Sequence, residues 1–190
     1  MRVIFLGPQG AGKGTISSRV SAKLKIPHIS TGDLFRDAIA AQTPLGKEAK
    51  KSIDQGKLVP DLITNALIRE HVEKKRCKKG FILDGYPRNI SQAKSLDSFA
   101  LPTQVILLDI PEQVSIERLA GRLQCKICKR VFNINAREDD KPQVIKQRLA
   151  AYRAETEPIV DYYKKQKKLH RIDATPTVEI ILKKIFRVLC

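Results

Sequence analysis

The sequence predicts an α/β fold in which a parallel five-stranded sheet carries helices on both faces. Short apolar runs typical of buried strands alternate with longer segments whose apolar residues recur at helical spacing. A glycine-rich loop joins the first apolar run to the first helical segment. Because strands that alternate with helices pair through crossover connections, this order favours a parallel sheet. The strands are expected at residues 2–6, 27–30, 80–84, 105–110 and 169–173.

The loop after the first strand predicts a phosphate-binding site. It runs Gly7-Pro8-Gln9-Gly10-Ala11-Gly12-Lys13-Gly14-Thr15 and fits the spacing G-x-x-x-x-G-K. Its glycines let backbone N–H groups turn toward an anion, the helix N-terminus adds partial positive charge, and Lys13 adds a full charge. Gly14 stands where the motif has a hydroxyl, so Thr15 is the predicted magnesium-binding hydroxyl. The predicted phosphate contacts are Gly10, Ala11, Gly12, Lys13, Gly14 and Thr15.

Four helices are expected between the first strand and the third. Ser30 or Thr31 can cap the second of them, and Asp33 places a favourable charge in its first turn. Pro44 and Gly46 are expected to interrupt the helical pattern. The four helices are expected at about 13–25, from 31 to the break at Pro44, at about 46–55, and in a segment that ends near 76.

Asp84 ends the third predicted strand and is a candidate magnesium ligand. In an open parallel sheet, ligands gather at the carboxyl ends of the strands, where Asp84 and the glycine-rich loop would both lie. Carboxylate oxygens are suitable ligands for magnesium. The alternative is that Asp84 only forms the turn before Gly85.

The second half of the chain adds two strands and four helices. Helical periodicity is lost over residues 123–138, after which Asp139 or Asp140 can cap a helix that continues through Tyr152, and Pro158 marks a bend or a new start. The helices are expected at about 89–99, 111–123, from 139 or 140 to 152, and at 178–189.

Length and composition favour one cytoplasmic globular domain. The chain has 190 residues, of which 42% are hydrophobic and 29% charged. No apolar stretch reaches the roughly 20 residues that span a bilayer, and the N-terminus has no signal-peptide pattern. The four cysteines are too few and too uneven for a disulfide framework, so thiols are expected at Cys77, Cys125, Cys128 and Cys190.

The net charge of +16 indicates an anionic partner without identifying it. Nucleic acid is disfavoured because only 5% of the residues are aromatic, there is no Trp, and no helix-turn-helix or zinc-finger spacing occurs. The three histidines, His28, His71 and His170, show no metal-binding spacing and are expected to have structural or surface roles.

Several further motifs, taken in order, resemble those of the adenylate kinases over nearly the whole chain. Beside the loop Gly7–Thr15, they are Ile29-Ser30-Thr31-Gly32-Asp33-Leu34-Phe35-Arg36, Gly56-Lys57-Leu58-Val59-Pro60, Leu83-Asp84-Gly85-Tyr86-Pro87-Arg88 with Gln92, Arg118-Leu119-Ala120-Gly121-Arg122, and Arg137-Glu138-Asp139-Asp140 with Arg148. Each motif alone is a modest signal, and their joint order and spacing make the resemblance specific.

The resemblance implies a P-loop nucleoside monophosphate kinase fold and reversible phosphoryl transfer from MgATP to AMP, which gives two ADP. It implies a single domain over 1–190, with a mobile AMP-binding segment at 30–59 and a shortened mobile lid at 122–138. It also implies magnesium as the cofactor, held by Thr15 and Asp84 partly through water, and a monomer whose partners are ATP, AMP and ADP, without nucleic acid or membrane.

Phosphoryl transfer requires charge neutralisation and alignment more than covalent chemistry, and arginine forks suit phosphate. By resemblance, the catalytic set is Lys13, Arg88, Arg122, Arg137 and Arg148. The AMP contacts are Thr31, Arg36, Lys57, Leu58, Val59, Gly85, Tyr86, Pro87, Arg88, Gln92, Arg137 and Arg148. Arg118, Arg122, Val131 and Phe132 join the phosphate loop as ATP contacts, with Arg118 stacked on adenine.

Two other functions remain open at this stage. Gln92 offers a donor and an acceptor that match the Watson–Crick edge of adenine, and Thr31 resembles the AMP-specific form of its motif. Asn89 after Arg88 is similar to the pyrimidine monophosphate kinases, so a UMP/CMP kinase is the first alternative. A nucleotide-binding module without turnover is the second.

The lid departs from the family pattern. Long lids in the family often bind structural zinc through two cysteine pairs, whereas the short stretch between Arg122 and Arg137 holds only Cys125 and Cys128. Because structural zinc takes four ligands, two cysteines are weak candidates, and we expect free thiols without zinc.

Overall fold

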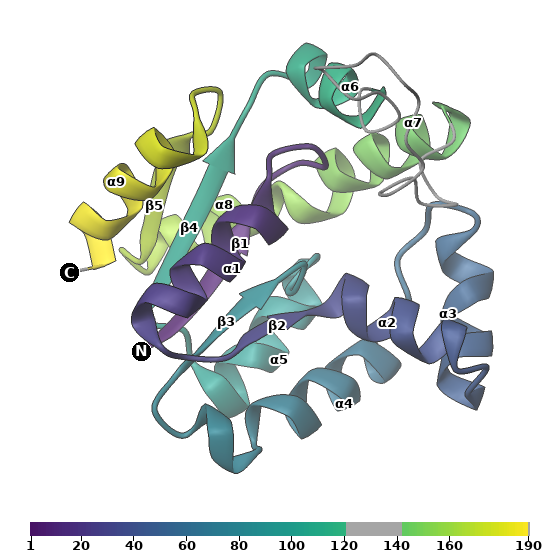
Figure 1. The fold of residues 1–190 in the computed structure, drawn as a ribbon. Helices are drawn as coiled ribbons and strands as arrows, with labels where there is room; N and C mark the ends of the chain where they lie inside the picture. The colour runs from purple at the N-terminus through teal and green to yellow at the C-terminus, as the bar shows by residue number, and fades with distance from the viewer. Residues whose placement is uncertain (121–141, 190) are drawn as a thin grey trace.

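The structure, a computed structural model, describes residues 1–120 and 142–189, which form an α/β fold around a parallel five-stranded sheet (Figure 1). The strand order is β2-β3-β1-β4-β5. This confirms the predicted fold class. The strands are β1 (Arg2–Leu6), β2 (His28–Ser30), β3 (Phe81–Asp84), β4 (Gln104–Asp109) and β5 (Leu169–Asp173).

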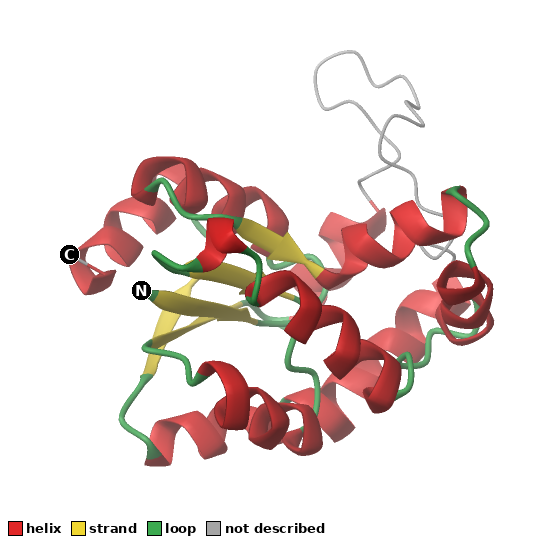
Figure 2. Ribbon diagram, turned by 90° about the horizontal axis from the view of Figure 1, so that it is seen from below, coloured by secondary structure: helices red, strands yellow, loops and turns green. Residues whose placement is uncertain are grey.

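Helices cover both faces of the sheet because alternate strand residues point to opposite sides. Ile4 and Leu6 of β1 pack in one cluster with α4 (Asp61–Val72), α5 (Ile90–Ala100) and α8 (Pro158–Lys165). Val3 and Phe5 pack in the other cluster with α1 (Lys13–Leu24) and α9 (Val178–Leu189). Figure 2 shows the strands enclosed between helices above and below them. The inner strands β1, β3 and β4 are largely apolar and buried because both of their faces are covered, whereas the edge strands β2 and β5 carry polar residues.

Helices α2 (Thr31–Ala40) and α3 (Pro44–Ile53) form a projection with an apolar cluster of its own. Phe35, Ala49 and Val59 are the buried residues of that cluster. Of the two predicted caps, Ser30 is the one that caps α2, since its side chain accepts a hydrogen bond from the backbone N–H of Asp33. This projection falls within the predicted AMP-binding segment at 30–59, and its mobility stays a prediction.

The expected interruption is present between Ala40 and Pro44, but the expected start of the next helix near residue 46 is wrong, because α3 begins at Pro44. Proline fits the first helical position, whose N–H has no partner within the helix. The Thr43 hydroxyl then accepts a hydrogen bond from the backbone N–H of Gly46 and caps the helix.

The remaining helices connect these layers. Helix α4 ends at Val72, a few residues before the predicted end, and a short 3₁₀ turn η1 (Lys75–Cys77) follows. Helix α6 is described over Glu112–Ala120 and α7 over Pro142–Ala151. A π-helical turn η4 (Tyr152–Thr156), which the sequence pattern did not predict, joins α7 to α8. No helix among the described residues is both long and apolar enough to cross a bilayer.

The sheet brings three chain segments to one edge. Strand β3 lies between β1 and β2, with Phe5 beside Asp84 and Ser30 beside Asp84 in register. Since the three strands are parallel, their carboxyl ends meet at this edge. The glycine-rich loop, the start of α2 and the turn after Asp84 therefore lie next to one another.

Candidate functional site

A cavity of about 900 Å³ opens at the carboxyl edge of the sheet. Its wall combines segments that are far apart in the sequence: the glycine-rich loop, the first turn of α1, α2, the connection before α4, the turn after β3, and α7. Among the predicted contacts, it is lined by Gly10, Gly12, Lys13, Gly14, Thr15, Thr31, Arg36, Lys57, Leu58, Val59, Asp84, Gly85, Pro87, Arg88, Gln92 and Arg148.

The backbone of the glycine-rich loop has no room for side chains at two positions. A Cβ on Gly7, where φ is 141°, would lie 2.4 Å from the Leu108 carbonyl oxygen. A Cβ on Gly10, where φ is 83°, would lie 2.8 Å from the Ser115 carbonyl oxygen. The Ser115 hydroxyl also donates to the Gln9 carbonyl. The loop is therefore pressed against β4 and α6, and its path requires glycine.

Lys13 lies at the start of α1 with its ammonium group held over the loop. Its Nζ donates to the carbonyl oxygens of Gly7 at 2.7 Å and Pro8 at 2.9 Å. The ammonium group of Lys13 lines the cavity beside the N-terminus of α1. Both features attract an anion.

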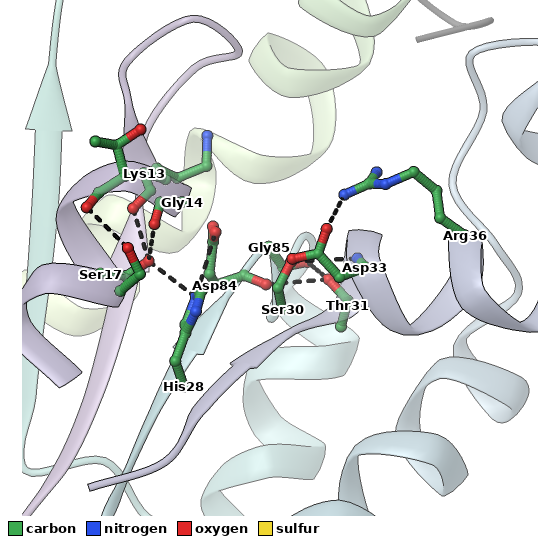
Figure 3. Close-up of polar contacts among 12 residues, drawn as sticks. Lys13, Gly14, Ser17, His28, Ser30, Thr31, Asp33, Arg36, Asp84 and Gly85 are labelled. Atoms are coloured by element: carbon green, nitrogen blue, oxygen red, sulfur yellow. Dashed lines mark hydrogen bonds and ion pairs between the residues drawn. The ribbon is translucent and has the colours of Figure 1, made fainter. Parts of the chain in front are cut away.

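Asp84 lies at the end of β3, buried to 7% exposure, and faces the first turn of α1 (Figure 3). A Cβ on Gly14 would lie 3.5 Å from Asp84 Oδ2. His28 Nε2 lies 3.7 Å from the same oxygen and 2.9 Å from Ser17 Oγ. The Ser17 hydroxyl donates to the Lys13 carbonyl oxygen, so these contacts connect β2, β3 and α1.

The donor set here suits a magnesium ion that arrives with a nucleotide. Asp84 offers a carboxylate and Thr15 a hydroxyl, and both line the cavity. Magnesium in phosphate sites binds one or two carboxylates and keeps water and phosphate oxygens as its other ligands. The described residues contain no group of three or more His, Cys, Asp or Glu side chains that could hold a metal ion by themselves. The residues present thus fit magnesium bound to a nucleotide.

Thr31, Gly85 and Arg88 form the wall opposite the glycine-rich loop. The Thr31 hydroxyl donates to the Gly85 carbonyl oxygen at 2.8 Å, and Arg88 Nε donates to the same oxygen at 2.8 Å. A Cβ on Gly85 would lie 2.7 Å from Thr31 Oγ1 and 3.1 Å from Arg88 Nη2. The Arg88 guanidinium is thereby held against the turn in a defined direction.

Arg36 brings a second guanidinium to this side of the cavity. It forms an ion pair with Asp33, one turn earlier on α2 (Figure 3). Lys57, Leu58 and Val59 line the same region from the connection that leads into α4. Cationic groups therefore border the cavity from α1, α2 and the turn after β3.

Gln92, on the first turn of α5, has both ends of its amide engaged. Its Oε1 accepts from the backbone N–H of Arg88 at 2.7 Å, and its Nε2 donates to Asp61 Oδ1 at 2.7 Å. The side chain is 1% exposed but contributes to the cavity wall. Its predicted contact with a nucleotide base stays a prediction.

Arg148 of α7 lines the cavity beside the glycine-rich loop. The Gln9 side chain spans the gap between the loop and α7, with Nε2 donating to the Arg148 carbonyl oxygen at 3.2 Å. This contact joins the loop to a helix about 140 residues later in the chain.

Of the predicted contacts that the structure describes, three do not line the cavity. Ala11 is buried. Tyr86 is buried in the core, where its hydroxyl donates to Asn65 Oδ1 at 2.6 Å and burial raises its pKa. Arg118 donates to the carbonyl oxygens of Ala174 and Thr175 at 2.9 and 3.0 Å, and to that of Gly10 at 3.4 Å.

The predictions for the lid lie outside the described residues. They concern the segment 122–138, the cysteine thiols and the helix cap before Pro142. The residues involved are Arg122, Cys125, Cys128, Val131, Phe132, Arg137, Asp139 and Asp140.

Sequence reasoning missed His28, Ser17 and Asp61. His28 lines the cavity and contacts Asp84, although only a structural or surface role was expected. Its position gave no clear signal, because His28 is the first residue of β2 and pairs in register with Ile82 rather than with Asp84. Ser17 and Asp61 carried no clear signal either, because each acts through a partner on another element.

Comparisons with known proteins cover the whole chain. A family model described as "Adenylate kinase" matches residues 5–168. The chain is 43% identical to the adenylate kinase of Thermodesulfovibrio yellowstonii, over 100% of this chain and 99% of that protein. It is 42% identical to the adenylate kinase of Borreliella burgdorferi, with 100% and 98% covered, and 46% identical to that of Treponema denticola, with 96% of each covered.

Proposed function

Because the chain belongs to the adenylate kinase family, it transfers a phosphoryl group from ATP to AMP, and we propose that the cavity described above is where it does so. The observation that supports this site is that Lys13 and Arg88 line one cavity together with Asp84. In this proposal ATP lies with its phosphates over the glycine-rich loop, and AMP lies against α2 and the turn after β3.

Lys13 and Arg88 neutralise the charge that spreads over the transferring phosphoryl group. This transfer needs in-line alignment and electrostatic stabilisation rather than a covalent intermediate. Arg88 is suited to this role because its Nε is fixed on the Gly85 carbonyl, which aims the fork of the guanidinium. Arg148 approaches from α7, and Arg122 and Arg137 complete the proposed set.

Thr15 and Asp84 would hold magnesium, partly through water. When bound, the ion would neutralise negative charge on the phosphates. The contacts of His28 with Ser17 and Asp84 keep the carboxylate beside α1.

The acceptor is AMP, placed by Thr31, Arg36, Arg88 and the connection Lys57–Val59. Gln92 pairs with the adenine edge, since its amide carries one donor group and one acceptor. The comparisons do not favour the UMP/CMP kinase, because the matched family and the relatives named above are adenylate kinases.

We extend the proposal to a monomer that works in the cytoplasm on ATP, AMP and ADP, without nucleic acid or membrane. Among the described cysteines, Cys77 is a buried free thiol, which is typical of a reducing compartment.

The test is direct measurement of nucleotides after the protein is mixed with ATP and AMP, with magnesium or with excess EDTA. We expect two ADP for each AMP consumed, and loss of turnover without magnesium. The acceptors UMP, CMP and GMP are compared at equal concentration. Nucleotide binding without ADP formation would support the non-catalytic module, and a preference for UMP or CMP would refute the assignment of Gln92.

A further inference from the structure

We propose that Asp61, the first residue of α4, determines which base the AMP site accepts by holding the Gln92 amide in one orientation. The inference rests on the proposed function, because it concerns the same acceptor site. Asp61 does not act on the phosphates. It is a positioning residue that works through Gln92.

The two ends of the Gln92 amide have partners of opposite character. Nε2 donates to the Asp61 carboxylate at 2.7 Å, and Oε1 accepts from the Arg88 backbone N–H at 2.7 Å. The oxygen and nitrogen of an amide have nearly the same shape, so an unconstrained glutamine can turn by 180°. Here that turn would place the amide NH₂ against an N–H and its oxygen against a carboxylate. Both hydrogen bonds of the buried Gln92 amide would be lost, and unsatisfied buried polar groups destabilise the folded state.

Asp61 is itself held in position. Its Oδ1 also accepts from Asn89 Nδ2 at 2.9 Å, and Asn89 Oδ1 caps α5 by accepting from the Gln92 backbone N–H at 2.8 Å. The carboxylate lies in the first turn of α4, where a negative charge is favourable. Three hydrogen bonds thus close a ring through Asp61, Asn89 and Gln92.

The engaged amide can still bind a base. An amide nitrogen has two N–H groups and an amide oxygen has two lone pairs. One N–H and one lone pair of Gln92 therefore remain after its hydrogen bonds with Asp61 and Arg88 are made. The order of donor and acceptor that the amide presents is, however, fixed.

That fixed order separates two classes of base. Adenine has an amino donor at position 6 and an acceptor at N1, whereas hypoxanthine has an oxygen acceptor at position 6 and an N–H donor at N1. An amide that matches adenine opposes hypoxanthine at both positions, unless it turns over. Asp61 prevents that turn. The site therefore takes 6-amino bases and rejects 6-oxo bases.

The experiment compares AMP with inosine monophosphate, whose base differs only at these positions. The diphosphate products are measured by chromatography, and kcat/KM is determined for each acceptor with magnesium-ATP in the wild type, Asp61→Ala and Asp61→Asn. We expect Asp61→Ala to lower the AMP-to-IMP ratio of kcat/KM by about tenfold, the scale of one hydrogen bond, mainly through better use of IMP.

Asp61→Asn separates the hydrogen bond from the charge. Asparagine loses the charge but keeps an oxygen that can accept from Gln92, so we expect the ratio to stay within about twofold of the wild type. A matched control is Asp161→Ala, which removes an exposed first-turn carboxylate from α8. This control should leave the ratio unchanged. Asp61→Ser, too short to reach Gln92, replaces the alanine variant if that variant does not fold.

Three results would overturn the inference. The first is an AMP-to-IMP ratio of kcat/KM that is unchanged in Asp61→Ala or Asp61→Ser. The second is a ratio that falls as far in Asp61→Asn as in Asp61→Ala. The third is a ratio that falls in Asp61→Ala only because kcat/KM for AMP falls. Failure of the proposed function is distinguishable, since the wild type would then form no ADP from AMP in the same assay.

Discussion

At the scale of single residues, Lys13 is the clearest case of a side chain whose surroundings define its chemistry. The loop carbonyls of Gly7 and Pro8 orient its ammonium group. The loop that supplies them is fixed by its contact with β4 and α6. The direction of the charge is therefore set by backbone geometry, which favours stabilisation of an anion without reorganisation.

We expect Lys13→Ala to lower kcat by about 10²–10³-fold, the usual effect of removing one preorganised charge from a transition state. Its thermal unfolding should change little, because the side chain is only half-buried. Steady-state kinetics of ADP formation provide the measurement. Lys23→Ala, an exposed lysine on the same helix, is the control and should retain activity. Activity of Lys13→Ala within threefold of the wild type would contradict the role.

The sequence predicted some site residues and missed others for a physical reason. Lys13, Thr15 and Arg88 belong to local motifs, and the residue types and spacing of these motifs predict phosphate binding. His28 and Asp61 act through partners 56 and 31 positions away, as their contacts with Asp84 and Gln92 show. Such contacts depend on strand register and helix packing, which no local pattern encodes.

At the scale of elements, α2 and α3 cross so closely that Gly46 has no space for a side chain. A Cβ there would lie 2.0 Å from the Ala38 backbone oxygen, and backbone cannot move aside as a flexible side chain would. The helix boundary predicted from this local sequence is wrong, because proline is typical both of a helix break and of a first helical position. Proline begins α3, and the glycine is needed for packing against α2 rather than for ending a helix.

We expect Gly46→Ala to destabilise this projection by about 1–3 kcal/mol, the usual cost of overpacking. The KM for AMP should rise more than the KM for ATP, because Gly46 packs against α2, which carries the proposed AMP contacts Thr31 and Arg36. Urea unfolding and steady-state kinetics test both points. Lys47→Ala, the next and exposed position on α3, should show neither effect.

Helices α5 and α8 are joined by one carboxylate. Asp97 of α5 accepts hydrogen bonds from the Tyr162 and Tyr163 hydroxyls at 2.8 and 3.3 Å and from Gln166 Nε2 at 2.9 Å. Tyr163 is fully buried. Burial first, and then the charge of Asp97, raise the pKa of Tyr163 above its ordinary value.

The raised pKa predicts loss of stability in alkali. Because the folded pKa lies above the unfolded value of about 10, the contribution of Tyr163 is complete below that pH and is lost as pH rises from there toward the folded pKa. Each such tyrosine lowers the free energy of unfolding by at most about 1.4 kcal/mol per pH unit. Urea midpoints between pH 8 and 11 should fall less steeply in Tyr163→Phe than in the wild type. Equal slopes would refute this explanation.

At the scale of the whole molecule, the alternation of strands and helices predicted the fold class but not the order of the strands. The sheet places β1 between β3 and β4, so its neighbours along the chain are not its neighbours in space. That order depends on which buried faces α1 and α4 cover, a property of the packed molecule. The carboxyl ends of β1, β2 and β3 nevertheless meet, as the parallel arrangement requires.

The net charge of +16, from 36 basic and 20 acidic residues, affects both the stability of the fold and the binding of anions. Like charges held on a compact surface repel one another and oppose folding. Added salt screens this repulsion, since the Debye length falls from about 30 Å at 0.01 M to about 10 Å at 0.1 M. The same screening weakens the attraction between the cavity and an anionic nucleotide. Stability and nucleotide affinity should therefore respond to salt in opposite directions.

We expect the thermal midpoint to rise and the affinity for ATP to fall as NaCl increases from 0.01 to 0.2 M. Calorimetry measures both quantities on one preparation. Sucrose at matched osmolality is the control, because it carries no charge, and it should leave the affinity for ATP unchanged. A midpoint that falls with salt would mean that attractive ion pairs outweigh repulsion. Exposed pairs such as Lys74 with Glu70 are too solvated for that, because water and salt screen their attraction.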